Sequence, residues 1–192
     1  LYKPRGAGPF PIVVNLHGGA WCRFDRTNDH IVNEPIAKTG VIIAAVDFRM
    51  PPEAAYPASM QDINYAVRWA KANAAKLKTR ADLIGLCGQS SGGHLGMLAA
   101  MRPNDPRYNS IPLAGGANVN ATVAYVAMRS PVSNTFARYE NAERRKNEGM
   151  IKNNKVFFSP WETIHESNPQ EILDRREAIT KVPFLIMQGA LD

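Results

Sequence analysis

Residues 88–93 read Gly-Gln-Ser-Ser-Gly-Gly, a run that can hold a reactive hydroxyl on a sharp turn. An apolar run over 83–87 precedes it and a helix-forming stretch over 94–100 follows it, which is the order of strand, tight turn and helix. Ser90 has Gly88 and Gly92 two residues away on either side, where any Cβ would collide with the neighbouring strand or helix. Ser90 is therefore a candidate nucleophile. An ordinary connecting turn or a phosphate-binding turn is the alternative.

A second glycine-containing motif follows an earlier predicted strand. The β-branched run over 11–16 leads directly into His17-Gly18-Gly19-Ala20-Trp21. Paired glycines after a strand leave backbone N–H groups unobstructed, and acyl transfer needs such donors where a carbonyl oxygen becomes an anion. We predict an oxyanion hole formed by the N–H groups of Gly18, Gly19 and Ser91, the residue after the nucleophile. A plain Gly-Gly turn is the alternative.

A candidate acid stands at the end of the chain. Residues 182–187 form another strand-like run, and Asp192 follows three positions after Gly189. A carboxylate at the carboxyl end of a late strand can orient a catalytic histidine and stabilise its charged form. Asp192 resembles the triad acid of the α/β-hydrolase superfamily, and this resemblance implies that it is the acid of a catalytic triad; a solvated loop aspartate is the alternative.

The histidine of such a triad is not evident. In the α/β-hydrolases that the chain resembles, the triad residues follow in the order Ser, Asp, His, so the histidine would follow Asp192, whereas the histidines of the chain all precede it. We expect His17 to support the glycine pair, His94 to pack or to face the substrate, His30 to lie on the surface, and His165 to lie in a variable region. We therefore expect the chain to be a portion of a longer hydrolase. A natively short chain without the base is the alternative.

The three motifs together resemble the α/β-hydrolase superfamily, and within it the hormone-sensitive-lipase-like and acetyl-esterase-like carboxylesterases. Residues 17–19 resemble the oxyanion loop of that family, residues 47–53 its Y-R-L-A-P-E stretch, and residues 88–93 its G-D-S-A-G-G elbow. Phe48 replaces the usual tyrosine, Met50-Pro51 replaces leucine-alanine, and Gln89 replaces the common acidic residue.

The resemblance implies a serine carboxylesterase that hydrolyses small to medium carboxylic esters through an acyl-enzyme on Ser90. It implies no metal and no organic cofactor. One alternative is an amidase of the arylformamidase type or a peptidase, since the same machinery cleaves amides. A non-catalytic binding protein that kept the α/β-hydrolase fold is the other.

The order of predicted elements favours an α/β fold. A helix near 29–39, a strand over 41–46, a helix over 59–76 and a strand over 121–128 alternate along the chain. In the helix over 59–76, Ile63, Ala66, Val67 and Ala70 have the spacing of a buried stripe. We predict a single domain over 1–192 with a mostly parallel sheet flanked by helices, an incomplete α/β-hydrolase fold. Sites in such sheets lie at the carboxyl ends of the strands, where Gly18, Ser90 and Asp192 fall.

Residues 129–181 interrupt this alternation with a polar segment that carries several prolines and aromatic residues. In the esterases that the chain resembles, an insertion at this place contributes to a cap over the site, so the resemblance implies a small cap-like insertion over 129–181. Phe157, Phe158 and Trp161 are expected to line a substrate pocket, and His17, Trp21 and His94 are further candidates for substrate contact. The alternative is that the aromatic residues form the insertion's own small core.

Composition and net charge limit the kinds of partner that the chain is expected to bind. A chain of 192 residues with 45% hydrophobic content can bury one substantial core. The net charge is +6, but the densest basic cluster, residues 144–146, alternates with glutamates, which predicts a solvated helix face rather than a nucleic-acid site. The positive balance is compatible with an anionic substrate. No apolar run is long enough to predict a membrane span. The compartment and the oligomeric state are not readable from the sequence.

Overall fold

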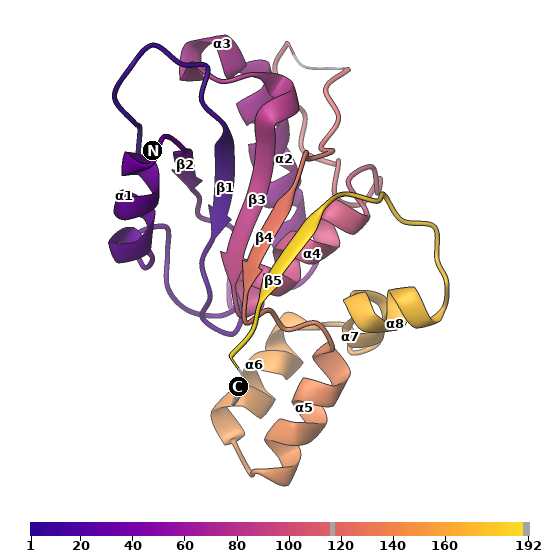
Figure 1. Cartoon of the computed structure of the whole chain (residues 1–192). Helices are drawn as coiled ribbons and strands as arrows, with labels where there is room; N and C mark the ends of the chain where they lie inside the picture. The colour runs from indigo at the N-terminus through magenta and orange to yellow at the C-terminus, as the bar shows by residue number, and fades with distance from the viewer. Residues whose placement is uncertain (116–117, 190–192) are drawn as a thin grey trace.

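The fold is built on a parallel sheet. The computed structural model describes residues 1–115 and 118–189. All of the strand pairs in the sheet are parallel, and the strand order is β2-β1-β3-β4-β5 (Figure 1). The strands are β1 (Ile12–Leu16), β2 (Ile42–Ala45), β3 (Ile84–Gln89), β4 (Val126–Arg129) and β5 (Phe184–Met187). The side chains of β5, at the edge of the sheet, are exposed.

Helices connect the strands, as an α/β fold requires. Those before β4 are α1 (His30–Lys38), α2 (Ala58–Ala72), α3 (Ala74–Leu77), the 3₁₀ turn Ala81–Leu83 and α4 (Ser91–Met101). Those between β4 and β5 are α5 (Thr135–Arg144), α6 (Glu148–Phe157), α7 (Thr163–Glu166) and α8 (Pro169–Asp174). The prediction of a mostly parallel sheet flanked by helices is confirmed.

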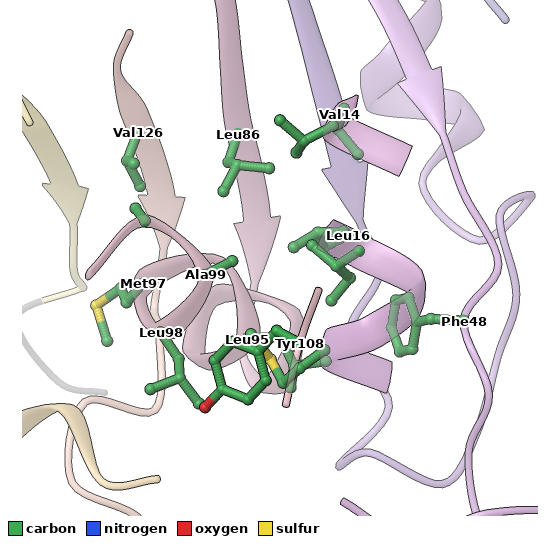
Figure 2. Packing of buried hydrophobic residues seen from close by; sticks show 14 of the residues in the cluster. Val14, Leu16, Phe48, Leu86, Leu95, Met97, Leu98, Ala99, Tyr108 and Val126 are labelled. Atoms are coloured by element: carbon green, nitrogen blue, oxygen red, sulfur yellow. The ribbon is translucent and has the colours of Figure 1, made fainter. Parts of the chain in front are cut away.

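The core follows from the two-residue period of the strands, which sends successive side chains to opposite faces of the sheet. On one face, strand residues such as Val14, Leu86 and Val126 pack against α4, whose Leu95 and Leu98 are fully buried (Figure 2). The hydrophobic cluster on the opposite face is smaller. It contains Val13 and Ile43 from the strands and Ala37 from α1. Each large apolar side chain buried in this way stabilises the fold by about 1.5–3 kcal/mol.

Two predicted elements have different bounds in the structure. The helix expected over 59–76 is divided at Asn73, whose side-chain amide donates to the carbonyl of Trp69 and so occupies the end of α2. The strand expected over 121–128 begins only at Val126. The Asn120 side chain accepts hydrogen bonds from the backbone N–H and the hydroxyl of Thr122, which holds this part of the chain in a turn.

The segment between β4 and β5 lies at the end of the sheet to which the strands point (Figure 1). Its buried side chains, among them Tyr139, Phe157, Phe158 and Ile164, belong to the same cluster as the side chains of the strands. The insertion therefore shares the core of the sheet and does not build a separate one.

A partly buried carboxylate ties this segment to the rest of the fold. Glu166 of α7 accepts hydrogen bonds from the Tyr56 hydroxyl at 2.7 Å and from Arg107 at 2.8 Å, and it also pairs with Arg102, which follows α4. Burial alone raises the pKa of Glu166, but the hydrogen bonds from Arg107 and Tyr56 and the nearby arginine charges bring it below its ordinary value. The charged carboxylate thus fixes α7 beside the C-terminus of α4.

Within the described residues, no helix has both the length and the apolar character needed to span a membrane.

Two isoleucines on helices test the core. Ile63 in α2 is fully buried, whereas Ile31 in α1 is 75% exposed. Ile63→Ala should lower the free energy of unfolding by about 3 kcal/mol, because it removes buried methyl groups and leaves a cavity. The matched change Ile31→Ala should shift it by less than about 0.5 kcal/mol. Chemical denaturation measures both, and equal costs at the two positions would contradict this assignment of the core.

Candidate active site

Ser90 occupies a strained turn between β3 and α4. Its backbone angles are φ 54° and ψ −119°, in a region that residues with a side chain rarely adopt. Three hydrogen bonds hold the turn. The Ser90 N–H donates to the carbonyl of Arg129 at 3.1 Å, and the Ser90 carbonyl accepts from the N–H groups of His94 at 3.0 Å and Val132 at 3.2 Å. Residues of α4, of β4 and of the loop after β4 therefore hold Ser90 in its strained conformation.

The flanking glycines allow the turn to sit close to its neighbours. A Cβ on Gly88 would lie 2.7 Å from the carbonyl oxygen of Gly92, in the first turn of α4. A Cβ on Gly92 would lie 2.1 Å from the carbonyl oxygen of Leu16, at the end of β1. These distances confirm the predicted collision with strand and helix at both positions.

The glycine pair after β1 lies beside this turn. A Cβ on Gly18 would be 3.6 Å from Cβ of Ser90 and 3.3 Å from the carbonyl oxygen of Gln89. Ser91 is the first residue of α4, so its N–H is one of the free donors of a helix N-terminus. No described residue accepts a hydrogen bond from the N–H groups of Gly18, Gly19 or Ser91. The three donors predicted for the oxyanion hole are thus unsatisfied by the described part of the protein.

The loop that carries the glycines is tightly folded. Gly19 has φ 106°, and a Cβ there would lie 2.1 Å from the carbonyl oxygen of Arg23. Ala20 and Trp21 also have positive φ, and the Cys22 N–H donates back to the Gly19 carbonyl at 3.2 Å. The chain therefore reverses direction directly after the glycine pair.

His17 packs next to the glycine pair. Its ring stacks on Phe48 with the centroids 4.4 Å apart, and its Nδ1 lies 2.8 Å from the carbonyl oxygen of Gly18. The side chain is buried, so it faces the protein interior. This position is the one expected for a residue that supports the loop, and it gives His17 no surface for direct contact with a substrate.

His94 is an internal structural residue. The Trp21 indole N–H donates to Nδ1 of His94 at 3.1 Å, and Nε2 lies 2.8 Å from the carbonyl oxygen of Ser167. Because the indole only donates and the carbonyl only accepts, the imidazole proton must sit on Nε2. Complete burial lowers the pKa of His94 to about 4, so the ring is neutral at pH 7. Of the two roles expected for His94, the structure shows packing: the ring is fully buried in this bridge and does not face a substrate.

The aromatic residues expected in a substrate pocket are instead packed together. Trp21, Phe157 and Phe158 are essentially inaccessible, and the Trp21 ring lies 5.5 Å from that of Phe157 and 5.1 Å from that of Phe158. Trp161 packs against Tyr139 at 4.7 Å. None of these residues lines the cleft beside Ser90. Burial of large aromatic surfaces is favourable, and here it joins the loop after β1 to the insertion.

A polar cleft of about 630 Å³ opens beside Ser90. It is formed at the ends of β3 and β4, by the loop that follows β4 and by α5, with Gln188 from the loop after β5. Its lining comprises Gln89, Ser90, Arg129, Ser130, Pro131, Val132, Ser133, Asn134, Ala137, Arg138, Asn141 and Gln188. Apart from Ser90, none of these residues is among the site residues predicted from the sequence. The rule that sites gather at the carboxyl ends of parallel strands could have indicated Arg129 and Gln188.

The other two histidines do not contact the candidate nucleophile. His30 is exposed at the start of α1. Nδ1 of His165 lies 2.9 Å from a carboxylate oxygen of Glu171, and its ring packs against Phe136 at a tilt of 41°. Asp192 lies outside the described residues, so its role as the triad acid stays a prediction.

A parallel sheet flanked by helices, with a tight strand-to-helix turn beside the end of the neighbouring strand, is the arrangement of an α/β-hydrolase fold. The comparison with protein families agrees with this class. The BD-FAE family model matches residues 1–192, and the chain belongs to that family.

Individual relatives are esterases by name. Esterase LipC of Mycobacterium tuberculosis is 32% identical over 201 residues, which cover 99% of this chain and 46% of LipC. The versiconal hemiacetal acetate esterase of Dothistroma septosporum is 36% identical over 110 residues, which cover 56% of this chain and 34% of that enzyme. The chain thus spans less than half the length of either curated relative.

The fold is also shared with a solved structure. Inhibited esterase B from Lactobacillus rhamnosis superposes with a TM-score of 0.78 at 23% identity, over 96% of this chain and 57% of that one. The likeness extends through the insertion, because it covers nearly the whole chain.

Gly92 provides a test of the close approach at the turn. Gly92→Ala should lower the free energy of unfolding by about 2–3 kcal/mol, because the new Cβ would displace the end of β1 from α4. Gly149→Ala is the matched control. A Cβ at Gly149 meets only a side-chain oxygen of Asn147 at 3.7 Å, and alanine favours the helix by up to about 1 kcal/mol. Thermal or chemical denaturation measures the stability of both variants. A Gly92→Ala variant as stable as the unsubstituted protein would contradict the described packing.

The buried bridge at His94 predicts a dependence of stability on pH. Folding lowers its pKa from 6.5 to about 4, so its contribution is complete above pH 6.5 and is lost as the pH falls toward 4. Between about pH 7 and about pH 5 this amounts to a loss of about 2 kcal/mol. His94→Gln cannot titrate and should show a flatter profile in denaturation measurements over this range. An unchanged pH slope in the variant would rule out His94 as the source.

Proposed function

We propose that this chain carries the nucleophile and the oxyanion hole of a carboxylic ester hydrolase. The observation that carries the proposal is the strained backbone of Ser90 next to Gly18, with three unsatisfied N–H donors from Gly18, Gly19 and Ser91 nearby. Backbone strain persists at a residue only where the surrounding structure imposes it. Membership of the BD-FAE family and the esterase names of the relatives support the same reaction class.

In the proposed reaction the Ser90 hydroxyl attacks the ester carbonyl carbon and forms a tetrahedral intermediate. Its negative oxygen accepts hydrogen bonds from the N–H groups of Gly18, Gly19 and Ser91, and the N-terminal end of α4 adds a favourable dipole. One such donor is typically worth about 3–4 kcal/mol to the transition state. The alcohol then leaves, the acyl group remains on Ser90, and water releases it in a second step.

Proton transfer requires a base that the four histidines of this chain do not supply. His17 and His94 are buried against other groups, His165 is paired with Glu171, and His30 is exposed on α1. We propose that the base is a histidine outside these 192 residues and that Asp192 orients it. That histidine would accept the proton of Ser90 and return it to the leaving alcohol.

The ester assignment is favoured over the two alternatives considered. Both relatives described above are named esterases, and the name of the Dothistroma enzyme specifies an acetate ester. A pure binding protein would have no use for a strained serine beside unsatisfied N–H donors. The cleft of about 630 Å³ is large enough for a small to medium ester, which is the substrate class that we propose.

Hydrolysis of p-nitrophenyl acetate or butyrate by the natural polypeptide that contains this chain tests the proposal. Ser90→Ala should lower kcat by several powers of ten, to about the residual level that an oxyanion hole and binding alone provide. Ser110→Ala, at an exposed position far along the loop after α4, should leave the rate unchanged. A parallel assay with matched amides separates an esterase from an amidase. Equal activity in Ser90→Ala would sink the assignment.

A further inference from the structure

Arg129 lies next to the candidate nucleophile. It is the last residue of β4, it is in register with Gln89 of β3, and its carbonyl oxygen accepts the hydrogen bond from the Ser90 N–H. Its side chain is exposed and lines the cleft that also contains Ser90. A ligand in this cleft with its ester carbonyl at Ser90 would therefore lie close to the Arg129 guanidinium, because both residues line the same cleft.

The guanidinium of Arg129 is available to a ligand. Within the described residues Arg129 forms no ion pair and its side chain makes no hydrogen bond. Other arginines of this chain are paired with carboxylates, namely Arg26, Arg49, Arg80, Arg102, Arg107 and Arg175. A guanidinium presents several N–H donors in a planar fork that matches the geometry of a carboxylate.

The rest of the cleft is complementary to a negative group. The lining includes amide side chains such as those of Gln89, Asn134 and Gln188, whose NH₂ groups can donate hydrogen bonds to an anion. None of the described lining residues carries a carboxylate. An exposed guanidinium attracts ligands of the opposite charge.

We propose that Arg129 determines specificity for esters that carry a free carboxylate, such as the monoesters of dicarboxylic acids. The effect of Arg129 on catalysis rests on the proposed function, in which Ser90 is the nucleophile. The ester carbonyl would lie at Ser90 while the carboxylate at the other end of the acyl group pairs with Arg129. A neutral acyl group of the same shape would leave the guanidinium without a partner.

Binding to the Ser90→Ala variant tests this proposal without turnover. Isothermal titration should show that monophenyl succinate binds about tenfold more tightly than phenyl isocaproate, its neutral counterpart of similar shape. In the same background Arg129→Gln should abolish the difference, whereas Arg129→Lys should retain part of it. Arg145→Gln removes the same charge at an exposed position outside the cleft and should change nothing. Equal affinities for the two esters, or a preference that survives Arg129→Gln, would overturn the proposal.

The rate measurement separates this proposal from the proposed function. With Ser90 intact, Arg129→Gln should lower kcat/KM for the succinate ester by about tenfold and leave that for the isocaproate ester unchanged. Failure of the esterase proposal would appear as no hydrolysis of either ester. The titration would still decide whether Arg129 selects a carboxylate.

Discussion

The site depends on the close approach of α4 to the end of β1. Gly92 allows this contact, since a Cβ there would lie 2.1 Å from the carbonyl oxygen of Leu16. The two elements carry the two halves of the proposed site, because Ser90 immediately precedes α4, Ser91 begins it, and Gly18 and Gly19 follow β1. A wider separation would move the proposed donors away from the serine. The close packing at Gly92 therefore sets the distance between Ser90 and the proposed N–H donors of Gly18 and Gly19.

The remainder of the fold secures that contact. The sheet places the carboxyl ends of β1, β3 and β4 side by side, and the Arg129 carbonyl fixes the N–H of Ser90 from β4. Behind the turn, Trp21, His94 and Ser167 form a chain of hydrogen bonds that joins the loop after β1, helix α4 and the insertion. The insertion thus contributes to the rigidity of the site through the core as well as forming a wall of the cleft through α5.

The alternation of apolar strands and helices along the sequence predicted the architecture. The glycines two residues before and after Ser90 predicted the turn, because between a strand and a helix this spacing is typical of a tight turn. The sequence could not show whether an aromatic residue faces a ligand or the core, since Trp21, Phe157 and Phe158 are apolar in either role. It likewise could not show that His94 is held between Trp21 and Ser167, contacts that join residues 73 positions apart. Arg129 was missed because its place beside Ser90 depends on the pairing of β4 with β3.

The central claim is that Ser90, held in a strained turn beside the oxyanion donors, is a reactive nucleophile. Reaction of the natural polypeptide with a fluorophosphonate, followed by peptide mass spectrometry, tests this claim most directly. The account predicts a single phosphonylated residue, Ser90, and no labelling of the Ser90→Ala variant. Labelling of a different serine, such as Ser91 or Ser133, or persistent labelling of the variant, would contradict it.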